Sequence, residues 1–270
     1  MKYVISLVKE IVKKRKMILD LALADFRKRF VGSYFGIVWM FLQPLVTVLI
    51  YWFIFGEYGM KTVPPVPNAT YVVWLVPGLV PWFFYSEALN SITGCLQEYS
   101  YLVKKVVFKV EMLPVIKLLS CLLVHFFFVL IMLALYAAYR QPVFATWIQI
   151  LYYTFAAAML ALAFGYFTSA VNVFFKDMAN IVGICLQFGI WMTPIMWNLE
   201  DLLAKYPILM VLKLNPLCYI VYGYRAVLFQ TGSVASLGWM NIYFWVVTIL
   251  VWLLGSHVFR KLKVHFADVL

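Results

Sequence analysis

Long apolar stretches dominate the chain, and their apolar residues do not alternate as they would in a β-barrel strand. A helix needs about 20 such residues to cross a bilayer. Stretches of roughly this length run over 33–55, 70–96, 115–139, 147–174, 178–197 and 239–259. The pattern predicts an all-α integral membrane protein with six transmembrane helices, in which residues 32–270 form the transmembrane domain.

Residues 1–31 precede the first span and have a different pattern. Apolar residues such as Val4, Leu7 and Ile11 recur every three or four positions, and basic residues fill much of the remainder. Such a segment is typical of an amphipathic helix lying in the membrane interface near lipid head groups. We expect the cluster Lys13–Lys16 to interrupt it. The alternative is a solvated charge cluster that only fixes topology.

Three further segments depart from a plain span. Pro77 and Pro81 lie in the first half of span two and predict a kink or break there. Residues 98–112 read as a short amphipathic helix between two spans. Residues 199–236 hold apolar pieces too short to cross, which favours short re-entrant outer helices.

Composition and charge support this topology. Of the 270 residues 66% are hydrophobic and 12% are charged, whereas soluble domains have about 25% charged residues. With the N-terminus inside, 17 of the 22 basic residues fall on the inner side. The positive-inside rule therefore predicts a multi-pass protein of the cytoplasmic membrane with both termini cytoplasmic. The net charge of +11 needs no nucleic-acid partner, because the basic residues flank spans.

Polar or small residues form stripes at helical spacing on several spans. One interpretation is helix packing, because small residues let membrane helices approach closely and amide side chains form hydrogen bonds between them. The other interpretation is that the stripes line a polar pathway. Glu87 is the strongest single candidate, since an acidic residue within a span usually faces a cavity or a partner. Aromatic residues are dense beside these stripes, and flat rings can bind sugar faces. The channel-lining candidates are Tyr34, Trp39, Phe41, Gln43, Thr47, Glu87, Asn90, Gln187 and Trp191.

No motif of enzyme chemistry stands out. The sequence has no phosphate-binding loop of the form GxxxxGK[ST] and no HExxH pair. Its four cysteines lack metal-binding spacing, so we expect no metal site, no catalytic residues and no cofactor in this chain.

Several ordered segments resemble a known family. They are Asp25–Trp39 followed by Gln43-Pro44, Pro77–Ser86, Asn172–Asp177, Thr193–Trp197 and Asn215–Leu217. Together they resemble the permeases of polysaccharide ABC exporters, which export O-antigen or teichoic acid. One departure is Lys176, where the family more often has Arg; the charge is kept.

The resemblance implies a half-transporter. Two copies would form the channel, and two separate ATPase subunits would bind ATP and Mg. The substrate would be a lipid-linked glycan taken from among the membrane lipids. Residues 98–112 would dock on the ATPase, through Tyr99, Tyr101, Leu102, Lys104, Lys105 and Phe108. Residues 199–236 would form outer gate helices.

The resemblance also gives the N-terminal segment a role at the channel entrance. Arg27, Lys28 and Arg29 would attract the lipid pyrophosphate at a gate, and Gly32, Ser33 and Gly36 would permit a tight bend. Whether the polar stripe of span one faces the path or the second copy stays open.

Three alternatives remain: an ABC exporter of drugs or small lipids, a membrane enzyme acting on lipid-linked sugars, and a secondary transporter. The absence of an acid–base constellation argues against the enzyme. The small number of charges within the spans argues against the secondary transporter.

Overall fold

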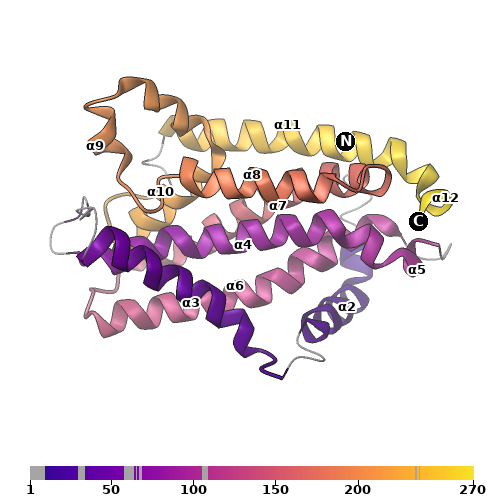
Figure 1. Cartoon of the computed structure of the whole chain (residues 1–270), viewed down its shortest axis with the longest axis horizontal. Helices are drawn as coiled ribbons and strands as arrows, with labels where there is room; N and C mark the ends of the chain where they lie inside the picture. The colour runs from indigo at the N-terminus through magenta and orange to yellow at the C-terminus, as the bar shows by residue number, and fades with distance from the viewer. Residues whose placement is uncertain are drawn as a thin grey trace.

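The computed structural model describes residues 10–29, 34–57, 64, 66, 69–104, 109–234, 236 and 238–270. These residues form helices and connecting turns, and none of them is in a strand. The long helices run side by side along the length of the molecule (Figure 1). They are α3 (Val38–Trp52), α4 (Tyr71–Glu98), α6 (Leu113–Ala138), α7 (Ile150–Phe174), α8 (Met178–Met192) and α11 (Gly238–Leu262). The predicted all-helical membrane fold is confirmed.

Among the described residues, five helical segments are long and apolar enough to cross a membrane, or six if the bent pair at 207–228 counts as one span, and α8 falls short of that length. The span expected over 178–197 therefore differs from the structure, because its helix ends at Met192. Thr193 is extended, with φ −96° and ψ 130°. Proline disfavours the helical conformation of the residue before it, so Pro194 accounts for this end.

Helices α4 and α7 form the centre of the bundle: 78% of the apolar stretch of α4 is buried, against 6% for the stretch that contains α3. Small residues allow close helix contacts. A Cβ added at Gly165 of α7 would lie 2.5 Å from the Ile92 side chain of α4. One added at Gly255 of α11 would lie 2.7 Å from the carbonyl of Ala163.

Of the kink or break expected in span two, the break is wrong, because α4 is one continuous helix through Pro77 and Pro81. Pro77 has no N–H to give to the carbonyl four residues earlier, that of Val73. The hydroxyl of Tyr136 donates to this carbonyl at 3.0 Å. A side chain of α6 thus satisfies the group that the proline leaves free.

The N-terminal segment includes α2 (Arg15–Lys28), which packs on α6 near one end of the bundle (Figure 1). The break predicted within Lys13–Lys16 falls at Lys14, which has φ −101° and ψ 18°. Helix α3 begins at Val38, after a turn in which Gly36 has φ +48°. This left-handed conformation suits glycine. Gly32 and Ser33 lie outside the described residues.

The connector between α4 and α6 is not the single helix predicted over 98–112. Tyr99 leaves helical geometry, with φ −106° and ψ 31°, and Lys109 is extended. Between them lies the short helix α5, and η2 follows Lys109. Their bounds are Ser100–Val103 for α5 and Val110–Met112 for η2. Lys105 and Phe108 lie outside the described residues.

Short elements fill the predicted outer segment at the opposite end of the bundle from α5 (Figure 1). They are α9 (Leu199–Leu203), the 3-10 helix η4 (Pro207–Leu214) and α10 (Pro216–Leu228). The axes of η4 and α10 meet at 91°, so the chain turns back at Asn215. We call this the α10 end of the molecule, and the opposite one the α5 end.

The C-terminal residues return to the α5 end as η5 (Lys263–His265) and α12 (Phe266–Val269), and α12 contacts α5. The Phe266 side chain is buried, with its ring centroid 5.4 Å from Phe259 and 6.1 Å from Phe174.

Candidate functional site

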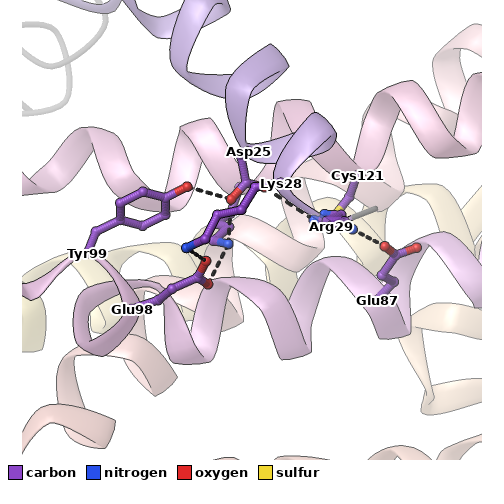
Figure 2. A network of polar contacts seen from close by, with 8 residues as sticks. Asp25, Lys28, Arg29, Glu87, Glu98, Tyr99 and Cys121 are labelled. Carbon is purple, nitrogen blue, oxygen red and sulfur yellow. Dashed lines mark hydrogen bonds and ion pairs between the residues drawn. The ribbon is translucent and has the colours of Figure 1, made fainter. Parts of the chain in front are cut away.

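Helix α2 docks on the bundle through a charged network centred on Asp25 (Figure 2). The Asp25 carboxylate is 2% exposed and accepts hydrogen bonds from Lys117 Nζ and the Tyr99 hydroxyl, both at 2.6 Å. Lys117 also donates to Glu98 at 2.6 Å. The Asp25 carboxylate of α2 thereby contacts Lys117 of α6 and Tyr99, the residue before α5. Through Lys117 it is also linked to Glu98 at the end of α4.

Two cations at the end of α2 complete the network. Lys28 Nζ lies 3.0 Å from Glu98, and Arg29 is ion-paired with Glu87 of α4. Arg29 also lies 3.5 Å from the Asp25 carboxylate and donates to Cys121 Sγ at 3.2 Å. Both cations are therefore engaged within the chain.

The charges of this network balance. Burial by itself raises the pKa of the Asp25 carboxyl, but the hydrogen bonds from Lys117 and Tyr99 outweigh it and lower the pKa below its ordinary value. Asp25 is therefore ionised at neutral pH. The balanced charges are the carboxylates of Asp25, Glu87 and Glu98 against the cations of Lys28, Arg29 and Lys117.

Sequence reasoning missed Asp25, Glu98 and Lys117 as site residues, although a signal was present. Ile18, Ala22 and Asp25 are the buried residues of α2 and follow helical spacing. A carboxylate on the apolar face of an amphipathic helix needs a buried partner. Lys117, a lysine in an apolar span, is the matching signal.

A groove opens beside this network between α3, α4 and α6, with a volume of about 460 Å³. Its polar lining comes from the predicted stripes of spans one and two, with Arg29 at one side. The structure thus brings together six of the predicted site residues. They are Arg29, Trp39, Gln43, Thr47, Glu87 and Asn90.

Apolar side chains, several of them aromatic, make up the rest of the lining. The aromatic ones are Trp39 of α3, Phe83 of α4 and Phe128 of α6. Charged, amide and hydroxyl groups therefore share one cavity with flat rings. Such a lining can contact a polar, hydroxyl-rich group as it crosses the membrane. The residues that line the groove do not form an arrangement suited to catalysis.

The other channel candidates lie outside this groove. Phe41 contacts Phe128, with ring centroids 5.8 Å apart, and Tyr34 is 97% exposed. Gln187 and Trp191 are exposed on α8, and Trp191 lies near Tyr51 of α3, with ring centroids 6.4 Å apart.

The coupling candidates Tyr101, Leu102 and Lys104 lie in or directly after α5 at the α5 end. Tyr101 is 55% exposed there. In the part of the chain that the structure describes, no group of three His, Cys, Asp or Glu side chains could hold a metal ion.

Comparison with known proteins agrees with this architecture. The family model described as the ABC-2 type transporter matches residues 21–229. The O-antigen export system permease protein RfbA of Myxococcus xanthus is 27% identical over 84% of this chain and 85% of its own. A protein of the same name from Klebsiella pneumoniae is 26% identical over 91% and 92%. The polysialic acid transport protein KpsM of Escherichia coli is 25% identical over 74% and 76%.

The family match covers the end of α2, the groove, the charged network and the α10 end. It confirms that the resemblance carried by the ordered motifs is a family relationship, and that the protein is a transport subunit and not an enzyme. The chain belongs to the ABC-2 type transporter family of multi-pass membrane proteins.

Proposed function

We propose that this chain is the permease subunit of an ATP-driven exporter that moves a lipid-linked polysaccharide, of the O-antigen or teichoic-acid type, across the cytoplasmic membrane. The observation that carries the proposal is the groove between α3, α4 and α6, where polar side chains share one cavity with aromatic walls. The names of the O-antigen and polysialic acid relatives support the same substrate class.

The exporter would contain two copies of this chain and two ATPase subunits, which would bind ATP and Mg. None of the residues of α3 is buried, and only Val182 is buried on α8. Helix α3 forms one wall of the groove, so a second copy placed against α3 and α8 would help to enclose it. The α5 end and both termini would face the cytoplasm, in keeping with the positive-inside rule.

The entry step follows from the charges of α2. Lys28 and Arg29 are already paired, whereas Arg27 is exposed and no described residue supplies it with a carboxylate. Arg27 would therefore make the first contact with the lipid pyrophosphate. Arg29, which lines the groove, would meet the substrate next as its pairing with Glu87 loosens.

Coupling would pass through the Asp25 network. An ATPase pushing on α5 would move Tyr99, which is hydrogen-bonded to Asp25. Because Asp25 belongs to α2 and Arg29 directly follows this helix, the motion would shift the cation at the groove. The network thus links the expected docking site of the ATPase to the expected entrance of the substrate.

An exporter of drugs or small lipids is less well supported, since the groove combines aromatic walls with amide and hydroxyl groups. The test uses proteoliposomes that contain the chain with its ATPase subunit. We expect Arg27→Gln to lower transport of a lipid-linked glycan and glycan-stimulated ATP hydrolysis severalfold, because the exposed charge is lost. Arg27→Lys should stay close to wild type.

Equal transport by Arg27→Gln and wild type would remove Arg27 from the entry step. A wild-type complex that moves small drugs and leaves lipid-linked glycans in place would refute the proposed substrate class.

A further inference from the structure

A second cavity, of about 390 Å³, is lined by residues of α9, α10 and the first part of α4. Helices α9 and α10 lie at the opposite end of the bundle from α5 (Figure 1). Its volume is within the range of small-molecule sites. The lining combines aromatic rings with hydrogen-bonding groups and one cation. The residues that matter here are Trp197, Asn198, Tyr222, Arg225, Phe229 and Thr231.

Arg225 of α10 is the cation of this cavity, and its side chain is held rigidly. The residue is 7% exposed, and its guanidinium donates to the backbone carbonyls of Trp74, Pro194 and Ile195. The guanidinium carbon lies 3.5 Å from the centroid of the Trp74 ring. A Cβ added at Gly78 would lie 3.0 Å from the guanidinium, so glycine leaves room for it.

Among the residues that the structure describes, no carboxylate balances the charge of Arg225. All three of its acceptors are neutral carbonyls, and no ion pair joins it to a described residue. Glu200, on nearby α9, is paired with Lys213 at 2.9 Å. A guanidinium has five N–H groups, so hydrogen-bonding capacity remains. A buried cation without a counter-charge is costly, and an anion in the cavity would offset that cost.

Tyr222 supplies an independent observation in the same cavity. Its hydroxyl oxygen is buried and makes no hydrogen bond within the described part of the chain. Buried hydroxyls normally have a partner. Since Tyr222 belongs to the lining of the cavity, a ligand there could provide one after the Tyr222 side chain turns to expose its hydroxyl.

We propose that this cavity binds one sugar unit that carries an anionic substituent, a carboxylate or a phosphate. The flat rings of Trp197 and Phe229 would contact the sugar, Asn198 and Thr231 would bond its hydroxyls, and Arg225 would hold the anionic group. Tyr222 would donate its free hydroxyl. The assignment rests on the proposed function, because such a unit would come from the exported polymer as it leaves at the α10 end.

The test measures binding by calorimetry to the full chain in phosphatidylcholine nanodiscs. The probes are glucuronate, glucose and glycerol 3-phosphate, the last standing for a lipid head group. We expect saturable binding of glucuronate, and glucose and glycerol 3-phosphate each at least about tenfold weaker, because each lacks the anion or the sugar ring.

Two variants locate the site. Tyr222→Phe removes a hydroxyl that makes no internal bond, so the fold is kept, and glucuronate should bind about 3- to 10-fold more weakly. Trp239→Ala is the matched control, since Trp239 is an exposed aromatic residue at the start of α11, outside the cavity lining. It should bind as wild type.

The proposal is overturned if glucose binds as well as glucuronate, if glycerol 3-phosphate matches glucuronate, if no probe saturates, or if Tyr222→Phe binds as wild type. The transport assay separates this failure from that of the proposed function. A complex that exports the lipid-linked glycan without binding glucuronate leaves the export function intact and removes only this site.

Discussion

Asp25 is the residue on which the docking of α2 depends. Its carboxylate is buried and bonded to Lys117 and Tyr99, which lie 92 and 74 residues away in the sequence. Removing one partner of a buried charged pair leaves the other uncompensated, and this loss exceeds the net value of the pair itself. The docking of α2 is therefore sensitive to a single charge.

We predict that Asp25→Asn weakens the docking of α2 by about 1–3 kcal/mol, because Lys117 keeps only Glu98 as a charged partner. Hydrogen exchange of the α2 amides should speed up accordingly, while exchange in α7 stays unchanged. Asp20→Asn is the control, since Asp20 is exposed on the same helix. Equal exchange in the two variants would contradict the role given to Asp25.

At this scale the sequence predicted the chemistry of single residues better than their partners. Helical spacing identified Gln43, Thr47, Glu87 and Asn90 as candidate channel residues, and all four line the same groove. Lys28 and Arg29 were expected to be open to a lipid phosphate, yet carboxylates of α4 pair with both. Those contacts join residues about 60 to 70 positions apart, which no local pattern reveals.

Among the elements, α12 is a helix of only four residues that is held in place by the bundle. Four residues cannot sustain a helix by themselves, and the burial of Phe266 between Phe174 and Phe259 supplies the missing stability. Lys263 adds an ion pair with Glu111 of η2, 2.5 Å away. The C-terminal segment is thus attached to α7 and α11 through Phe266 and to η2 through Lys263.

We predict that Phe266→Ala releases α12, because truncating a buried phenylalanine costs about 3–5 kcal/mol. The release should be local: exchange at 263–270 and in α5 should rise, while the thermal midpoint of the bundle changes little. Val264→Ala serves as the control, since Val264 is 76% exposed. Unchanged exchange in α5 would show that α12 does not support it.

Apolar length and spacing predicted the long helices closely, because a span must be long and apolar whatever it packs against. The local rules for proline and for the connector were less dependable. Pro77 and Pro81 were expected to kink or break α4, and 98–112 to form one helix. Tertiary contacts decided both cases: the Tyr136 hydroxyl bonds the carbonyl that Pro77 leaves free, and Asp25 bonds Tyr99.

Across the whole molecule, burial separates a packed block from peripheral helices, of which α3 is the least buried. Helices α4 and α7 are largely enclosed, whereas α3 buries none of its residues and is preceded by the turn at Gly36. A shift of α3 would therefore disturb few core contacts. This asymmetry fits a groove whose width changes while the rest of the bundle stays in place.

The orientation of the molecule gives a prediction that labelling can check. In a Cys185→Ser background, which removes the exposed native thiol, Tyr206→Cys and Ala267→Cys place single reporters at opposite ends. In intact cells a membrane-impermeant maleimide should label position 206 alone, and position 267 only after lysis, because basic residues gather at the α5 end. The reverse pattern would invert the assigned topology.

The bond from Tyr136 to the Val73 carbonyl has a consequence for the history of this protein. Pro77 creates the need for a donor, and Tyr136 on another helix meets it. A change at one position therefore alters the selective value of the other. Lineages that replace Pro77 regain a backbone donor and are free to lose the tyrosine hydroxyl, whereas lineages that keep the proline are not. Positions 77 and 136 should accordingly co-vary among relatives of this chain.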